Sequence, residues 1–406
     1  MTNITEILWQ KINANSDKIE NFFSEHFSKK PANFYNSCDL RNSGFKIAPV
    51  DTNCFPAGFN NLSQISLENA QKIADDFFNK NFPDAKKIII VPENHTRNLR
   101  YLENLLAIQK IIGKNREVII GTLLGEVKEK VTIEINESSK IELEPLVLLN
   151  DKIATKDGFV ADLIILNNDL TDGIPQILEN TITPIIPTIN LGWFQRIKSN
   201  HFTIYNDLAS KLASIINIDP WLISTIHDHC DDVNFKEQKG MDSLVKYVDS
   251  TIAKIKEKYQ EYGISDEPYV YVKADNGTYG MAIWAISSGQ EILEINKKNR
   301  NKMHMIKGSV QNTKIMIQEG VKTIDRINDN FAEPMIYSIN GNVIGNLFRV
   351  NETRDEKTSL NSTGATFFDL TEINDSQINL GLEKEKITAV YGLVAKLASL
   401  ASSYEI

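Results

Sequence analysis

Apolar, β-branched segments alternate with amphipathic helical segments from residue 66 to residue 190, and this alternation constrains the fold more than any other feature. The run Lys87-Ile-Ile-Ile-Val91 favours a buried strand, whereas 99–112 carries apolar residues at helical spacing. Strands that alternate with helices are typical of an open, largely parallel α/β sheet. The expected strands are 85–91, 117–124, 131–135, 141–149, 162–167 and 183–187, and the expected helices are 67–81, 99–112 and 174–179.

Polar clusters follow three of these strands. They are 93–97, which includes Arg97, then 167–169 and 190–196. Ligands of open α/β sheets bind beyond the carboxyl ends of the strands, so these clusters either contact a ligand or are ordinary polar loops. We take Arg97 as a candidate substrate-binding residue.

In the remaining sequence, the composition and the spacing of apolar residues change twice along the chain. Helical spacing marks 1–30, and it returns at 201–216, 221–228 and 243–262. Between the first helices and the alternating region, 31–63 is rich in Gly, Pro, Asn and Asp, which predicts a loop with one short strand at 45–50. Strand-like segments return after 269. These changes, in a chain of 406 residues, predict an N-terminal domain over 1–200 and a C-terminal domain over 201–406.

Charge and composition exclude several classes of protein. Lys and Arg number 44 and Asp and Glu number 53, so the net charge is −9, which disfavours generic binding to nucleic acid or to anionic membranes. No apolar stretch approaches the ~18 residues of a membrane span, and the N-terminus lacks the pattern of a secretory signal. Three cysteines without a CxxC motif fit a reducing compartment. We therefore expect a cytoplasmic protein.

A glycine-containing hairpin follows a lysine near residue 270. A β-branched and aromatic strand ends at Lys273, and a loop with Asn276, Gly277, Thr278 and Gly280 precedes a second strand. Backbone N–H groups of such a loop can approach phosphate oxygens, and the lysine supplies a positive charge. The spacing is not that of a P-loop, because no Gly-Lys-Ser/Thr opens a helix. The alternative is a plain hairpin.

Two later segments add the charges that a nucleotide site requires. The strand at 315–321 carries Gln318 and Glu319, and a hairpin with the turn Asn340-Gly341 runs from Glu333 to Arg349. In an antiparallel pair the first and last residues meet, so Glu333 and Arg349 should lie side by side. A small-residue loop with Asn361 follows. Carboxylates, an arginine and an amide together suit Mg²⁺ bridging to nucleotide phosphates.

The order of these pieces over about 265–365 resembles the ATP-grasp nucleotide-binding domain. With 39–41, Lys46, 49–53 and 55–61 added, the chain from about 35 to the C-terminal helix at 387–403 resembles the ATP-grasp-related bacterial family of glutamate–cysteine ligases. The resemblance implies an N-terminal α/β, pre-ATP-grasp-like domain and a C-terminal ATP-grasp-like α+β domain. It also implies ATP-dependent joining of the γ-carboxylate of glutamate to the amine of cysteine, the first step of glutathione biosynthesis.

Roles for individual residues follow from the resemblance and from what the substrates require. Amino-acid carboxylates need cations, and ammonium groups need carboxylates or amides. The expected substrate-binding residues, besides Arg97, are Arg41, Lys46, Asp51, Asn53, Asn60 and Asn61. The expected catalytic residues are Lys273 and Arg349, and the expected ATP-binding residues are Lys273, Asn276, Gly277, Thr278, Gly280, Gln318, Glu319 and Val321.

The metal ligands depart from the pattern of glutathione-synthetase-like enzymes, which place an acidic pair after the last helix. Here the sequence ends at Ile406, just after that helix, so we expect earlier ligands for Mg²⁺, namely Glu319, Glu333 and Asn361, with Glu352, Asp369 and Glu372 as the alternatives. The substrates would be glutamate, cysteine and ATP. Two alternatives stay open: another ATP-grasp carboxylate–amine ligase, similar to glutathione synthetase, and a non-catalytic nucleotide- or amino-acid-binding protein.

Three further features have simpler interpretations. His227 and His229 would point about 200° apart on the expected helix, so they should not chelate a metal together. Cys54 lacks a histidine at fixed spacing and is not expected to be a nucleophile. The apolar stripe of the C-terminal helix predicts core packing or a dimer contact, which leaves a homo-oligomer open.

Overall fold

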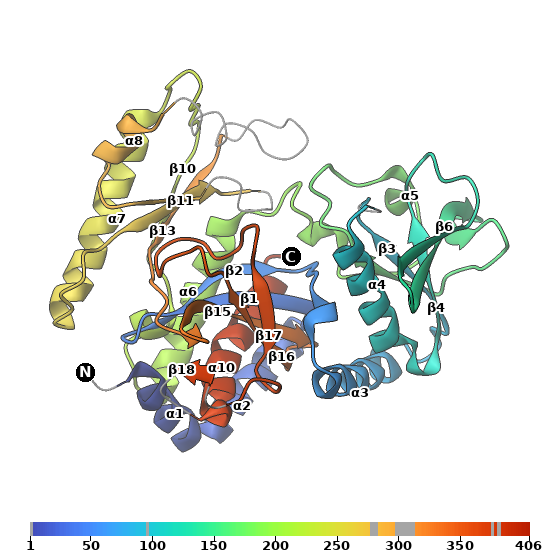
Figure 1. Cartoon of the computed structure of the whole chain (residues 1–406), viewed down its shortest axis with the longest axis horizontal. Coiled ribbons are helices and arrows are strands. Elements are labelled where there is room, and N and C mark those ends of the chain that lie inside the picture. Colours follow the sequence, from blue (N-terminus) through green and yellow to red (C-terminus); the bar gives the residue numbers. More distant parts are fainter. Residues whose placement is uncertain (1–2, 95–96, 277–282, 297–312, 375–376, 380–382) are drawn as a thin grey trace.

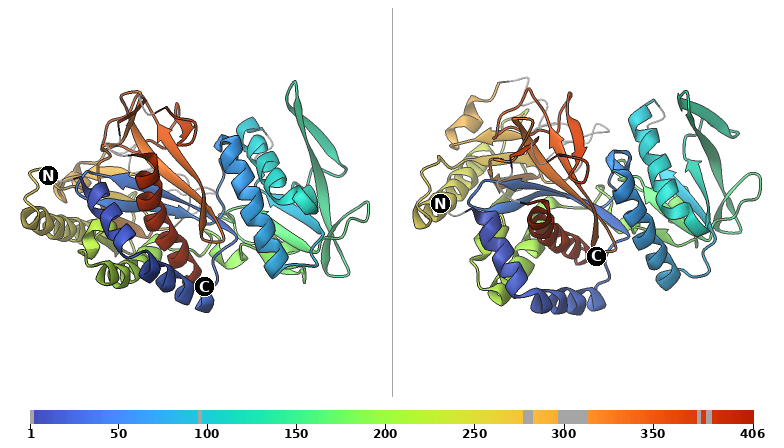
Figure 2. Two further views of the ribbon diagram at one scale, coloured as in Figure 1. Left: turned by 90° about the horizontal axis from the view of Figure 1, so that it is seen from below. Right: turned by 60° about the horizontal axis from the view of Figure 1, so that its bottom comes forward.

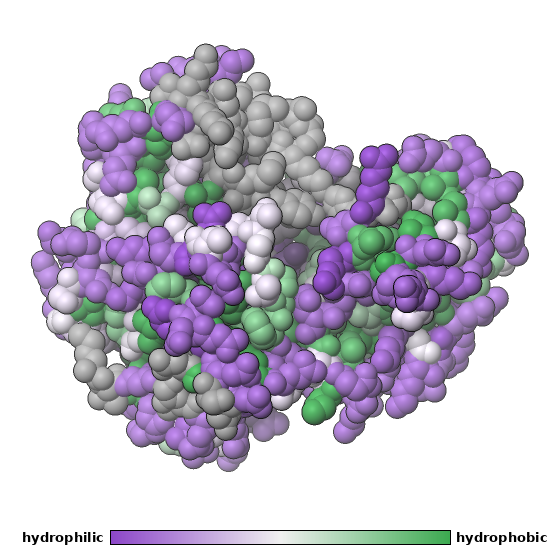
Figure 3. All heavy atoms as spheres, viewed as in Figure 1, coloured by the Kyte–Doolittle hydropathy of each residue, from purple (hydrophilic) through white to green (hydrophobic). Residues whose placement is uncertain are grey.

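The chain has a mixed α/β fold. A computed structural model describes residues 3–94, 97–276, 283–296, 313–374, 377–379 and 383–406. These residues form three sheets, which we call the parallel sheet, the central sheet and the four-stranded sheet (Figure 1). The space-filling view shows a mostly hydrophilic face, with a notch between the part that contains the parallel sheet and the rest of the molecule (Figure 3).

The parallel sheet confirms the expectation from the alternating pattern. Its strand order is β5-β6-β4-β3-β8-β9, and β3 runs parallel to both β4 and β8. Strands β5 and β7 pair antiparallel with β6, so the expected hairpin is also present. We call this part, residues 64–197, the α/β unit. Its elements are α3 (Gln64–Asn81), β3 (Lys87–Pro92), α4 (Leu99–Ile112), β4 (Glu117–Thr122), β5 (Val131–Asn136), β6 (Ser139–Leu149), β7 (Lys152–Thr155), β8 (Leu163–Asn167), α5 (Gln176–Glu179) and β9 (Ile185–Ile186).

The central sheet joins the two ends of the sequence. Its antiparallel strands run in the order β17-β16-β15-β1-β2, and β14 and β18 extend it beyond β15. The Asn340-Gly341 turn between β15 and β16 has positive φ at both residues, as a type I′ turn requires. The strands are β1 (Tyr35–Asn42), β2 (Ile47–Asn53), β14 (Arg326–Ile327), β15 (Asn330–Ile339), β16 (Asn342–Val350), β17 (Thr366–Asp369) and β18 (Ile378–Asn379).

The sequence predicted one short strand, at 45–50, in a loop over 31–63. The structure contains two strands there: β2 corresponds to the predicted one, and β1 was not predicted. Cys38 and Leu40 of β1 are fully buried, whereas Asp39 and Arg41 point to the opposite face. This strand is difficult to recognise in the sequence because the side chains on its second face are polar. Besides the neighbouring β2 it pairs with β15, which lies about 300 residues later, so no local pattern indicates this second pairing.

The four-stranded sheet has the antiparallel order β10-β13-β11-β12, which confirms the predicted hairpin around Lys273. The expected helix at 221–228 is wrong: a short 3-10 turn, η4 (Pro220–Ile223), leads into β10, which pairs with β13. This non-local pairing overrides the local helical spacing. The other elements are α7 (Met241–Glu261), α8 (Gln290–Glu294), β10 (His227–Cys230), β11 (Val270–Ala274), β12 (Trp284–Ile286) and β13 (Ile315–Glu319).

Four helices cover one face of the central sheet (Figure 2). They are α1 (Ile4–Ala14), α2 (Ser16–Lys29), α6 (Lys198–Ile216) and α10 (Lys384–Ser403). The apolar stripe of α10, which includes Val390, Val394 and Leu397, is buried against the sheet and belongs to the core of this chain. Burial of such side chains is worth roughly 1.5–3 kcal/mol each.

The domain division at residue 200 stays a prediction. Helix α6 begins at Lys198, close to the expected boundary, but the central sheet contains strands from both sides of it. In the part of the chain that the structure describes, no helix is long and apolar enough to cross a membrane.

Candidate active site

One face of the central sheet is charged. Residues two apart on a strand share a face, so Asp39 and Arg41 of β1 lie together, opposite the face that packs on α10. Glu333 of β15 is the direct cross-strand partner of Arg349 of β16, which confirms their expected juxtaposition. Asp51 of β2 is in turn the cross-strand partner of Asp39. The pleat of four neighbouring strands thus brings five charged side chains to one surface.

Arg349 lies between two carboxylates. Its Nη1 donates to Asp39 Oδ2 at 2.9 Å and to Glu333 Oε2 at 3.2 Å. The Arg349 side chain is only 6% exposed, and its Nε has no partner among the described residues. Burial raises the pKa of Asp39, and the carboxylates of Glu333 and Asp51 add to this rise, whereas Arg349 opposes it. We call Asp39, Glu333 and Arg349 the arginine cluster.

A second group of charges lies next to it on β2. Lys198, the first residue of α6, donates to both carboxylate oxygens of Asp51, at 2.8 and 3.0 Å. Lys273 of β11 donates to the carbonyl oxygen of Val50 at 2.9 Å. The Asp51 side chain is 43% exposed, so one side of it faces solvent. We call Asp51, Lys198 and Lys273 the lysine cluster.

The pKa values of two members of the lysine cluster, Lys273 and Asp51, are shifted. Burial lowers the pKa of Lys273 to about 8, while the nearby Asp51 carboxylate opposes this shift. For Asp51, removal of water favours the neutral acid, but the charges of Lys198 and Lys273 outweigh it and lower the pKa below its usual range. At neutral pH the Asp51 carboxyl is therefore ionised, and the Lys273 amine is mostly protonated.

Arg41 contacts protein groups only. Its Nε donates to Glu333 Oε1 at 2.7 Å, and its Nη atoms donate to the Tyr271 hydroxyl and to three backbone carbonyls. These carbonyls belong to Val321, Glu356 and Thr358, at 3.1, 3.1 and 2.6 Å. Arg41 is 1% exposed, and its contacts connect the central sheet with β11 and the loop 351–365. Its expected role as a substrate ligand stays a prediction.

Lys46 and Glu319 form a separate buried ion pair. Lys46 Nζ lies 2.7 Å from Glu319 Oε2, and the ammonium sits 4.4 Å from the ring centroid of Trp221. Glu319 also accepts from Trp221 Nε1 at 3.0 Å and from the backbone N–H of Ile226 at 2.9 Å. Both charged side chains are 0% exposed. The structure therefore does not bring Lys46 to the surface as a substrate ligand or Glu319 to the arginine cluster as a metal ligand.

Of the asparagines expected to bind substrate, Asn53 ends β2, whereas Asn60 and Asn61 lie in the segment that joins the central sheet to the α/β unit. Asn53 Oδ1 accepts from the backbone N–H of Phe55 at 2.9 Å and caps a turn. Asn60 Nδ2 lies 3.4 Å from Glu103 Oε2, and Asn61 stands in the 3-10 turn η1 (Phe59–Asn61). Arg97 is exposed. None of these four side chains contacts either cluster in the described part of the chain.

The expected nucleotide-binding residues are only partly described. Gly277, Thr278 and Gly280 lie outside the described residues. Asn276 Oδ1 is buried without a described partner, and so is Gln318 Oε1, whose Nε2 lies 3.4 Å from the carbonyl oxygen of Pro49. Val321 is buried and Asn361 is exposed in the loop 351–365. Gln318, like Lys273, therefore reaches β2.

Three residues of the site escaped the sequence analysis as functional candidates. Asp39 was part of a motif but carried no role, and its alternation with Cys38 and Leu40 at period two was the available signal. Lys198 stands in the first turn of α6, where the helix dipole disfavours a cation, and a cation in such a place suggests a function. Tyr271, which accepts from Arg41, gave no signal.

Carboxylates suited to Mg²⁺ are present as a pair. Asp39 and Glu333 flank one guanidinium nitrogen, and enzymes commonly bind Mg²⁺ with one or two carboxylates plus phosphate oxygens. Within the described ranges, no three His, Cys, Asp or Glu side chains gather to hold a metal.

His227 and His229 lie on strand β10, not on a helix, so the expected helical separation of about 200° between their side chains was wrong. His227 instead contacts Thr203 and Asn206, at 3.2 and 3.3 Å.

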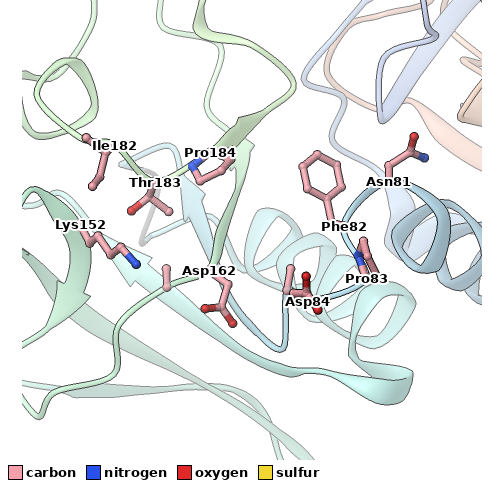
Figure 4. Close-up of a pocket in the computed structure, with 11 residues that line it drawn as sticks. Asn81, Phe82, Pro83, Asp84, Lys152, Asp162, Ile182, Thr183 and Pro184 are labelled. Carbon is pink, nitrogen blue, oxygen red and sulfur yellow. The ribbon is translucent and has the colours of Figure 1, made fainter.

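A cavity of about 390 Å³ lies elsewhere, in the α/β unit (Figure 4). Apart from Lys152 of β7, its lining residues precede β3, β8 and β9, so it lies at the amino ends of these parallel strands. Asp162, on its wall, accepts the backbone N–H groups of Lys86 and Lys87, both at 2.9 Å. Ligands of such sheets bind at the opposite, carboxyl ends, and this cavity is not part of the charged site.

The fold and the site together define a class of protein. Two adjacent clusters of carboxylates and cations, set between sheets of a mixed α/β fold, can bind anionic substrates and hold them close together. The model of the glutamate-cysteine ligase family matches residues 9–406. The chain belongs to this family.

A solved structure supports the same assignment. A protein from Methylobacillus flagellatus KT, assigned provisionally as a gamma-glutamylcysteine synthetase, is 38% identical. The match covers 98% of this chain and 95% of that one, with a TM-score of 0.90. No curated protein matches the sequence.

More distant structures also match. A glutathione synthetase like-effector from Globodera pallida is 9% identical with a TM-score of 0.42, and the match covers 90% of this chain and 80% of that one. The D-alanyl-alanine synthetase A of Vibrio cholerae is 12% identical with a TM-score of 0.35, over 76% of this chain and 80% of that one. These two similarities are too low to bear on the site.

The contacts of Arg41 predict a loss of stability when its charge is removed. Arg41→Met would leave Glu333 buried beside fewer partners, and breaking a buried ion pair costs about 3–5 kcal/mol. Urea unfolding of the variant measures this loss. Lys211→Met is the control, because Lys211 pairs with Asp207 on the exposed face of α6 and should change stability little. If Arg41→Met keeps its stability and loses only glutamate binding, Arg41 is a substrate ligand after all.

Proposed function

We propose that this ligase activates the γ-carboxylate of glutamate as an acyl phosphate. A carboxylate oxygen attacks the γ-phosphorus of ATP and ADP leaves. The neutral amine of cysteine then attacks the acyl carbon, and phosphate departs with one of the original carboxylate oxygens. Because both first reactants are anions, the protein must bring like charges together, and positioning and electrostatic stabilisation dominate such catalysis.

The arginine cluster is the observation that carries the proposal. Arg349 presents a buried guanidinium between Asp39 and Glu333, where it can stabilise the transferring phosphoryl group. Asp39 and Glu333 would hold Mg²⁺, which when bound neutralises charge on the phosphate oxygens. Glu333 was expected as a metal ligand, and Asp39 takes the place that the sequence analysis gave to Glu319.

The lysine cluster supplies the remaining contacts of the proposal. Lys273, at the end of β11 and before the glycine-containing loop, is assigned to the ATP phosphates. Asp51 has a solvent-facing side and is assigned to the ammonium group of an amino-acid substrate, with Lys198 near the substrate carboxylate. In this arrangement the four-stranded sheet and the central sheet form the two sides of an ATP-grasp-like site.

The cellular setting is part of the same proposal. Cys38, Cys54 and Cys230 are free and buried, which suits a reducing compartment. We place the enzyme in the cytoplasm.

Oxygen transfer tests the acyl phosphate directly. With glutamate carrying ¹⁸O in both γ-carboxylate oxygens, each phosphate released in the presence of cysteine, ATP and Mg²⁺ should contain one ¹⁸O atom, as measured by mass spectrometry. Unlabelled phosphate would contradict the mechanism. A control with γ-glutamylcysteine and glycine should turn over more slowly, and faster turnover would move the assignment to a glutathione-synthetase-like ligase.

Substitution of Arg349 should slow the chemical step. We expect Arg349→Lys to lower kcat at least ~10-fold and Arg349→Ala ~100-fold or more, because a lysine lacks the planar fork that reaches several oxygens. Arg116→Lys is a matched control: this buried arginine pairs with Asp75 at 2.8 Å in the α/β unit, far from the clusters in the fold. Steady-state kinetics at saturating substrates would refute the assignment if both Arg349 variants kept near-normal kcat.

The lowered pKa of Lys273 predicts a pH dependence for ATP use. With a pKa of about 8 in the free enzyme, the charged form is lost as pH rises through 8. Since kcat/KM reports groups of the free enzyme, kcat/KM for ATP should fall by up to ~10-fold per pH unit above this value. Lys273→Arg should move the fall to higher pH, because arginine stays charged. An unchanged profile in this variant would show that another group titrates.

A further inference from the structure

A buried group of ionisable side chains lies behind the lysine cluster. Arg196 donates two parallel hydrogen bonds to Glu405, from Nε to Oε2 at 2.7 Å and from Nη2 to Oε1 at 2.9 Å. His201 Nδ1 lies 2.6 Å from the same Oε1. All three side chains are 5% exposed or less. Glu405 follows α10, whose end lies beside β2 (Figure 1).

Two paths connect this group to Asp51. Arg196 Nη1 donates to the carbonyl oxygen of Thr52, the residue after Asp51 on β2. The ring of Trp193 contacts two cations, with Arg196 Cζ at 4.7 Å and Lys198 Nζ at 4.2 Å from its centroid. Lys198 in turn holds both oxygens of Asp51. Glu405, Arg196, Trp193, Lys198 and Asp51 therefore form a continuous set of contacts.

The charges explain why Glu405 matters to this set. Arg196 and Lys198 are buried cations that share one aromatic ring, and Lys198 also stands at the unfavourable end of α6. A buried arginine without a carboxylate partner is strongly disfavoured. Besides Glu405, the carboxylate whose charge acts on Arg196 is Asp51, so without Glu405 the arginine would compete with Lys198 and with a substrate ammonium for Asp51.

We infer that Glu405 is a positioning residue for the amino-acid side of the active site: by anchoring Arg196, it leaves Asp51 paired with Lys198 and open to the substrate. The inference rests on the role proposed above for Asp51. It adds a residue at the far end of the sequence to the reaction, through contacts that run along β2 and the first turn of α6.

Kinetics of Glu405→Gln test the inference. Glutamine keeps the size of the side chain and removes its charge. We expect KM for one amino-acid substrate to rise at least ~10-fold, because small displacements of positioning groups have large effects, while KM for ATP changes less than ~2-fold. Glu405→Asp should give a smaller rise. Asp75→Asn, which removes the charge from the Arg116 pair in the α/β unit, should leave all KM values unchanged.

A double substitution separates the inference from the proposed role of Asp51. Asp51→Asn alone should raise the same KM, and Glu405→Gln should add nothing in that background, because both act through one carboxylate. If Asp51→Asn raises this KM and Glu405→Gln does not, or if the two effects simply add, the inference is overturned and the role of Asp51 stands. If Asp51→Asn changes no KM, the role of Asp51 fails and the inference with it. Should Glu405→Gln not fold, Arg196→Lys, which keeps the charge and loses the fork, must show the same selective rise in KM.

Discussion

The buried guanidinium of Arg41 is the interaction on which the arrangement of the site depends. Removing such a group from water costs several kcal/mol unless every donor finds an acceptor, and Arg41 finds its acceptors on β15, on β11 and in the loop 351–365. These contacts fix the four-stranded sheet against the charged face of the central sheet. Together with the contacts of Lys273 and Gln318 to β2 and the Lys46–Glu319 pair, Arg41 sets the positions of Lys273 and Arg349 relative to each other, since the described strands of the two sheets do not pair.

The site also contains charges of both signs in close contact. Asp39 and Glu333 pair with Arg349, and Asp51 pairs with Lys198, so these charges are compensated before any substrate arrives. A cluster of this kind has its dipoles in place and needs little reorganisation when phosphate charge is transferred. Asp39 and Glu333 therefore have two roles, as structural partners of Arg349 in the free enzyme and as the proposed ligands of Mg²⁺.

Local patterns predicted the local structure well, because helix α4 and strand β3 carry clear periodicity and the Asn340-Gly341 turn has its own signature. The pairing of Glu333 with Arg349 followed from that turn. What could not be predicted was where a charge finds its partner: Arg41 and Lys46 were expected to meet substrates, and they meet carboxylates more than 270 residues away in the sequence. The pairing of β1 with β15 and the contacts of Glu405 with Arg196 were missed for the same reason, because these partners are about 300 and 209 residues apart in the sequence.

The pairing of β1 with β15 has a consequence for the synthesis of the protein. Tyr35 faces Ile339, so β1 waits for a partner that is made about 300 residues later. At about 5–20 residues per second, the ribosome needs roughly 15–60 s to cover that interval, whereas the strands of the α/β unit find all their partners within residues 64–197. The α/β unit can thus fold on the ribosome while β1 and β2 wait, and the rate of translation sets the earliest moment at which the arginine cluster can form.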